Sequence, residues 1–140
     1  MNRLICIYKG NETKCTDSLV AEDCVKIPGI DSEINIEELD ELYNINSTVV
    51  YKQYSFDNFD GISVALKRKE ICIFTFDFDI AEQLKFDSRY DVGTWETHIP
   101  MSEVEKVMIE KEYLIGEKKG MKECYEEDII TFVTWMENYW

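Results

Sequence analysis

The chain has 140 residues, of which 45% are hydrophobic, and its 29 acidic and 15 basic side chains give a formal net charge of −14. This length suits one compact domain, and we expect residues 1–140 to form a single domain with a sizeable core. The negative charge disfavours binding to nucleic acids and to anionic membranes, because it repels phosphate groups, and it favours a basic partner. The common alternative is an acidic surface that only keeps the protein soluble.

The cysteines and the N-terminal segment indicate a reducing compartment. The five cysteines are odd in number and form no Cys-x-x-Cys pair, so we expect reduced thiols. The apolar run at the N-terminus is too short for a secretion signal, and no stretch approaches the roughly 20 apolar residues of a membrane span. We therefore expect a cytoplasmic protein.

The N-terminal third begins with strand patterns. Residues 4–8 are predicted as a strand that ends at a Lys9-Gly10-Asn11 turn, and residues 18–20 and 24–27 as short strands before a Pro28-Gly29 turn. A helix is predicted to follow, because Asn35 and Glu38 can form a capping box. Its apolar residues fall at helical spacing: Ile36, Leu39, Leu42 and Tyr43.

Acidic side chains are concentrated around this predicted helix. Residues 17–46 contain nine acids and one base, which gives a net charge of −8. These acids are either a solvated helix face or a site for a basic partner, and the sequence leaves both open.

Four strands are predicted in the middle of the chain, at residues 48–56, 62–67, 71–80 and 84–92, and the first three form an antiparallel meander. The strand at 71–80 is the most apolar and is expected to organise the fold. Its core-facing side would carry Cys72, Phe74, Phe76 and Phe78, and each buried Phe stabilises by about 1.5–3 kcal/mol. Residues 93–100 are predicted as a loop.

The C-terminal segment is predicted to be helical. Ser102 and Glu105 suggest a second capping box that opens a helix ending at Gly116, followed by an exposed turn at residues 117–120. The last helix is strongly amphipathic and should lie across the sheet, with apolar positions at Ile129, Phe132, Val133, Met136, Tyr139 and Trp140. The predicted class is α+β, with a twisted antiparallel sheet of about five or six strands and packed helices.

Few residues suggest chemistry. Asp77 and Asp79 on one strand face, about 7 Å apart, are a possible Mg²⁺ site, although a polar strand end is the commoner explanation. His98 is the only histidine, which leaves at most a Cys-His or Asp-His arrangement, and no nucleophile or phosphate-loop motif is present. We predict no catalytic activity, no cofactor and no metal.

The C-terminal half, residues 60–140, resembles immunity proteins of contact-dependent growth inhibition and related polymorphic toxin systems. The matching features are an aromatic β-meander, Thr97-His98-Ile99-Pro100-Met101-Ser102 before a helix, and Gly120-Met121-Lys122-Glu123-Cys124-Tyr125 before a final amphipathic helix. The resemblance implies a cytoplasmic protein that binds one cognate toxin domain, often a basic nuclease, and blocks it. It implies no binding residues.

We therefore expect an antitoxin-like inhibitor that binds a basic toxin domain. The alternatives are an acidic nucleic-acid mimic that inhibits a defence nuclease, or a small metal-dependent enzyme using Asp77 and Asp79. Carboxylates that imitate phosphate, and an aromatic anchor in a turn, are the predicted partner-binding residues. They are Glu37, Asp40, Glu41, Asp57, Phe59, Asp60, Asp77 and Asp79.

Overall fold

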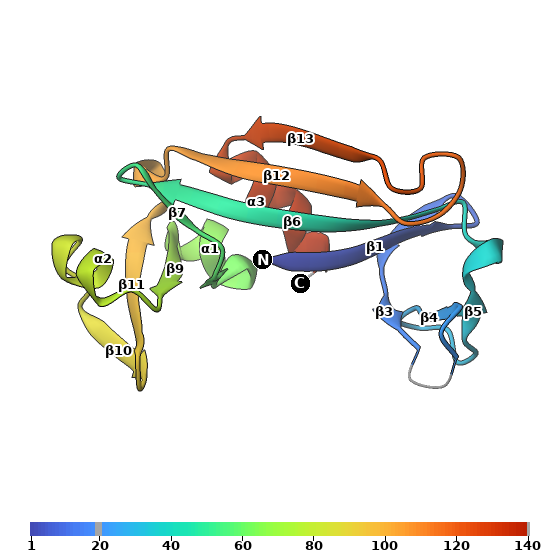
Figure 1. Cartoon of the computed structure of the whole chain (residues 1–140), viewed down its shortest axis with the longest axis horizontal. Coiled ribbons are helices and arrows are strands. Elements are labelled where there is room, and N and C mark those ends of the chain that lie inside the picture. The colour runs from blue at the N-terminus through green and yellow to red at the C-terminus, as the bar shows by residue number, and fades with distance from the viewer. Residues whose placement is uncertain (19–20, 140) are drawn as a thin grey trace. The chain divides into compact units, whose positions relative to one another are not determined.

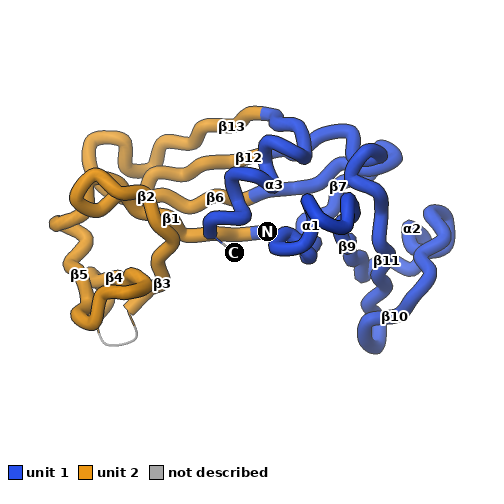
Figure 2. The backbone as a smooth tube through the Cα atoms, turned by 180° about the vertical axis from the view of Figure 1, so that it is seen from behind, with its two compact units in different colours: residues 1, 47–108, 126–140 blue, residues 2–46, 109–125 orange. Residues whose placement is uncertain are grey.

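The computed structural model describes residues 1–18 and 21–139, which form two compact units (Figure 2). Unit 1 contains residues 1, 47–108 and 126–140, and unit 2 contains residues 2–46 and 109–125. The described strands pair into sheets of six, four and three strands, accompanied by three α-helices and short 3-10 helices (Figure 1). The predicted α+β class with an antiparallel sheet is confirmed. The single domain stays a prediction.

The six-stranded sheet has the order β13-β12-β6-β1-β2, and β7 pairs with β6. Two tight hairpins organise it, because Lys9-Gly10 and Lys52-Gln53 all have positive φ, as two-residue turns that match the strand twist require. Strands β6, β12 and β13 have residues in both units. The bounds are β1 Asn2–Tyr8, β2 Asn11–Lys14, β6 Glu41–Tyr51, β7 Tyr54–Phe56, β12 Lys106–Tyr113 and β13 Lys122–Glu127.

Unit 1 contains the four-stranded sheet, with the order β10-β11-β9-β8, and the three α-helices. Helix α3 packs against α1, and the Phe132 ring meets the Phe59 ring edge-on at 6.1 Å between centroids. These contacts form the core of the unit. The bounds are β8 Phe59–Asp60, α1 Ile62–Arg68, β9 Glu70–Thr75, α2 Phe78–Gln83, β10 Ser88–Asp91, β11 Thr94–Pro100, η2 Met101–Glu103, α3 Ile129–Met136 and η3 Glu137–Tyr139.

Unit 2 contains a small three-stranded sheet and its own apolar cluster. The strands are β3 Thr16–Asp17, β4 Cys24–Lys26 and β5 Ile34–Asn35, followed by the 3-10 helix η1 Ile36–Glu38. The cluster consists of Cys6, Cys15, Val25, Ile27, Ile34, Leu39 and Leu42.

Several predicted elements are confirmed. Strands form in the segments expected at residues 4–8 and 24–27, and the closing helix buries Ile129, Phe132, Val133, Met136 and Tyr139 as its apolar spacing predicts. The single strand predicted at residues 48–56 is instead the end of β6 and the antiparallel β7, joined by the Lys52-Gln53 turn. Part of the strand predicted at residues 18–20 lies outside the described residues, as does Trp140.

The helix predicted after Asn35 is wrong beyond its first turn. The capping box of Asn35 and Glu38 forms, but it opens only the three residues of η1, because Leu39 is extended. The chain then enters β6, which pairs with β1 and has buried side chains on both faces, such as Leu42 and Tyr43. Sheet pairing outweighs local helical spacing here.

Two predicted strand or loop assignments in unit 1 are also wrong. Residues 62–67 form helix α1 rather than a strand, since Ile62 and Ala65, three residues apart, are the ones buried while Leu66 is 40% exposed. Residues 93–100 form β11 rather than a loop, with Trp95 opposite Thr75 on β9.

The helix predicted from Ser102 is a strand. Only η2 forms there, and the Glu105 carboxylate accepts a hydrogen bond from the backbone N–H of Gln53 at 3.1 Å instead of capping a helix. In β12, Val107 and Ile109 are buried on either side of the exposed Met108, which is the period of a strand.

Candidate protein-binding surface

The strand predicted at residues 71–80 ends early, and this creates the most distinctive surface of unit 1. β9 stops at Thr75, because the Asp77 side chain accepts hydrogen bonds from the N–H groups of Asp79 (2.9 Å) and Ile80 (3.2 Å) and so caps α2. The predicted core row of phenylalanines is therefore wrong. Phe76 is 68% exposed and Phe78 is 56% exposed.

The buried residues of β9 lie mainly on the face opposite to the predicted one, and Cys72 of the predicted face is buried as well. Ile71, Ile73 and Thr75 are buried, as alternate residues on one side of a strand. The other side carries Cys72 and the half-buried Phe74, which lie opposite His98 and Glu96 of β11.

Strands β9, β10 and β11 pair in one sheet, and α2 contacts both β9 and β11 (Figure 1). Phe74 packs edge-on against Tyr90 at 5.2 Å between ring centroids, and Phe78 packs against Trp95 at 5.5 Å. Tyr90 is 67% exposed even so. We give the name aromatic rim to the exposed or half-buried large apolar residues that these elements and the turns beside them carry, namely Phe74, Phe76, Phe78, Tyr90, Val92 and Trp95.

The rim lies in an acidic segment. Residues 74–96 contain six acids (Asp77, Asp79, Glu82, Asp87, Asp91 and Glu96) and two bases (Lys85 and Arg89). No ion pair joins any of them to another residue of the described chain. Large apolar side chains left in water are typical of a protein-binding surface, and carboxylates beside them would favour a basic partner over an acidic one.

The four-stranded sheet brings Cys72 and His98 together, a pairing in which a Cys-His arrangement could form. Cys72 lies opposite His98, but its thiol donates a hydrogen bond to Glu96 Oε2 at 3.6 Å. Burial, followed by the charge of Glu96, Asp60 and Asp87, raises the pKa of the Cys72 thiol from 9.0 to about 12. A cysteine nucleophile reacts as the thiolate, so this environment suppresses the reactive form.

The predicted Asp77–Asp79 pair does not share a strand face. Both residues lie at the start of α2, and one carboxylate oxygen of Asp77 is occupied by the two N–H groups that it caps. Among residues 1–18 and 21–139, no group of three or more His, Cys, Asp or Glu side chains is placed to hold a metal ion.

The other predicted binding residues are divided between the units. In unit 2, Glu37 lies in η1, Asp40 accepts a hydrogen bond from Gly10 N–H at 3.0 Å, and Glu41 begins β6. In unit 1, Asp57 accepts a hydrogen bond from Thr48 Oγ1 at 2.7 Å, and Asp60 from Gly61 N–H at 2.7 Å.

The prediction that Phe59 is an exposed binding anchor is wrong. It is only 3% exposed, because β8 pairs with β9 and turns the ring toward Phe132. Sequence reasoning placed Phe76 and Phe78 in the core and so missed the rim. The signal that could have found it is Asp77, a good N-cap residue directly between them.

No protein-family model matches the chain, and no curated protein or solved structure is significantly similar to it. None of the helices in the described residues is long and apolar enough to cross a membrane.

Proposed function

We propose that this protein is a non-enzymatic, cytoplasmic immunity protein that binds and neutralises a basic toxin domain. Its binding surface in this proposal is the aromatic rim with the carboxylates around it. The single observation that carries the proposal is the exposure of Phe76, Phe78 and Tyr90 beside acids without ion pairs.

The aromatic side chains would supply affinity. Rings held by neighbouring side chains lose little conformational freedom on binding, and Phe74 and Trp95 already restrain Tyr90 and Phe78 through ring contacts. Truncating such an anchor commonly weakens binding by 2 kcal/mol or more, on the order of thirtyfold, mainly through faster dissociation.

The acids would raise the association rate and favour a basic partner. Asp79, Glu82 and Asp87 are exposed around the rim, and opposite charges on a partner steer encounter at low salt. An inhibitor that must reach a toxin before the toxin reaches its substrate benefits from fast association. This electrostatic part of the binding must weaken as the salt concentration rises.

Growth protection tests the proposal. Where a toxin domain is encoded beside this gene, cells that produce that domain should survive when they also produce this protein. The double variant Phe76→Ser/Phe78→Ser should lose protection, because it removes two anchors without touching the core. Met121→Ser is the matched control: Met121 is also exposed, at 55%, but lies in unit 2, and protection should be retained. Full protection by the double variant would contradict the proposal.

A further inference from the structure

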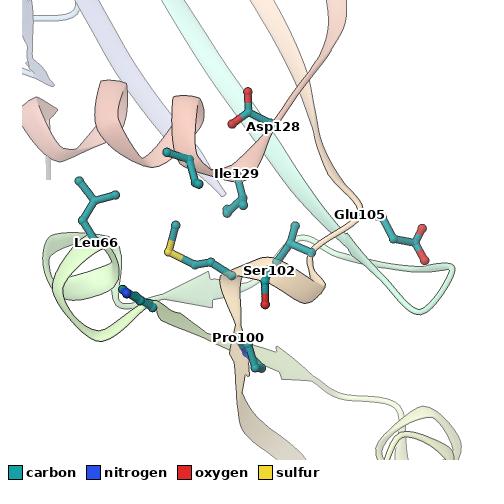
Figure 3. A pocket seen from close by; sticks show the side chains of 10 residues that line it. Leu66, Pro100, Ser102, Glu105, Asp128 and Ile129 are labelled. Atoms are coloured by element: carbon teal, nitrogen blue, oxygen red, sulfur yellow. The ribbon is translucent and has the colours of Figure 1, made fainter.

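A second feature of unit 1, separate from the aromatic rim, is an apolar pocket of about 540 Å³. It is lined by the C-terminal end of α1, by η2 and the residues after it, and by the start of α3 (Figure 3). The Met101 N–H donates to the Lys69 carbonyl at 2.9 Å, which ties η2 to the end of α1. The volume lies within the range typical of small-molecule sites, about 300–1,000 Å³.

The walls of the pocket are mainly apolar. Its apolar lining residues are Leu66, Pro100, Met101, Val104, Ile129 and Ile130. Leu66 is 40% exposed and Ile130 is 59% exposed, so apolar surface continues to the mouth. An apolar ligand would remove this surface from water.

The charged lining residues differ in what they can offer a ligand. Asp128 is occupied, because its carboxylate accepts hydrogen bonds from the Thr131 N–H at 2.9 Å and from Thr131 Oγ1 at 2.6 Å. The Glu105 carboxylate accepts a hydrogen bond from the Gln53 N–H. Both carboxylates point away from the space between Leu66 and Ile129 in Figure 3.

Lys69 is the remaining charged group. No ion pair joins its ammonium to another residue of the described chain, and it follows Lys67 and Arg68 at the end of α1. Of these three bases, Lys69 is the one that lines the pocket. Lys69 is the single base among the charged lining residues in the described part of the chain, and Glu105 and Asp128 are already engaged by backbone N–H groups.

We propose that this pocket binds a small free acid with an apolar body, such as a medium-chain fatty acid. The apolar body lies against Leu66, Met101 and Ile130, and the carboxylate lies at the mouth beside Lys69. The site shares no residue with the aromatic rim, so the two proposals stand or fall separately.

Octanoate and octylamine are the probes. They share an apolar chain and differ in charge, and the net charge of the protein alone would favour the amine. Methionine-methyl NMR gives the readout, because Met101 lines the pocket while Met121 lies in unit 2. Octanoate should shift the Met101 signal saturably and leave Met121 unmoved. Octylamine should bind roughly threefold more weakly than octanoate. Hexanoate should also bind more weakly than octanoate, by about fourfold for each of the two methylene groups that it lacks.

Two variants complete the test. Lys69→Asn suits the positive φ of +59° at this position and should abolish the preference for the acid. Ile130→Asp adds a negative charge at an exposed position of the mouth and should weaken octanoate binding at least tenfold with an unchanged melting temperature. Any of three results would overturn the proposal: an unmoved Met101 signal, an amine that binds as tightly as the acid, or capture only on anionic lipid vesicles.

Discussion

At the scale of single residues, several exposed carboxylates of unit 1 accept hydrogen bonds from the backbone. Asp77 and Asp128 each accept hydrogen bonds from the first N–H groups of a helix, and Asp60 accepts one from Gly61. These bonds satisfy backbone donors that a helix or turn leaves unpaired. An acid predicted only as a partner contact can therefore also stabilise the fold, and the two roles need different tests.

Asp77→Ala should lower the free energy of unfolding by about 1 kcal/mol, because α2 loses its N-cap and β9 loses the residue that ends it. Asp79→Ala removes a charge from the same first turn but no capping bonds, and should cost only a few tenths of a kcal/mol. Urea denaturation of both variants measures the difference. Equal losses would show that the effect is one of charge rather than of capping.

Cys72 should resist alkylation at pH 8, whereas the exposed Cys124 should react readily. The pKa of Cys72 is raised to about 12 in the folded protein, so the fold favours the protonated thiol. That contribution to stability is fully present below the unfolded pKa near 9.0 and is lost as the pH rises toward 12. Iodoacetamide labelling followed by peptide mass spectrometry gives both rates, and equal rates would refute this environment for Cys72.

At the scale of elements, the sequence predicts those whose signals are local. The amphipathic spacing of α3, the turn at Lys9-Gly10 and the capping box of Asn35 and Glu38 are all present. A capping box specifies where a helical turn begins but not how far it continues. That length is decided by pairing with distant strands, such as β1 with β6.

The same limit explains the exposed phenylalanines. Phe74, Phe76 and Phe78 alternate as strand residues do, and the pattern remains valid only while the strand lasts. The end of β9 depends on Asp77 and on where β11 stops pairing, at Trp95 opposite Thr75. The Asp77 N-cap signal is local and can be read from the sequence, whereas the point at which β11 stops pairing cannot, so the strand pattern alone leaves Phe76 and Phe78 in the core.

Phe132→Ala should destabilise unit 1 by about 3–5 kcal/mol, because the ring is 1% exposed and contacts Phe59 in the core. Ile130→Ala, two residues earlier in α3 and 59% exposed, is the control and should cost less than about 1 kcal/mol. Chemical denaturation followed by tryptophan fluorescence measures both. A small loss for Phe132→Ala would mean that α3 does not depend on this contact.

At the scale of the whole molecule, the negative charge is shared by both units. Unit 1 has fifteen acids and seven bases, and unit 2 has fourteen acids and eight bases. The acidic segment that stands out in the sequence is residues 17–46, and its described residues all belong to unit 2. The exposed aromatic residues instead single out the acids of unit 1, because charge without apolar anchors gives encounter but little residence time.

The proposed function depends on binding of a basic protein by the aromatic rim. Its most direct test is affinity capture from the lysate of the source cells at low and moderate salt, with the wild type, Phe76→Ser/Phe78→Ser and Met121→Ser compared by mass spectrometry. We expect one stoichiometric basic polypeptide, which the wild type and Met121→Ser retain, which salt weakens and which the double variant loses. Equal retention by the double variant, or no specific partner of the wild type, would contradict it.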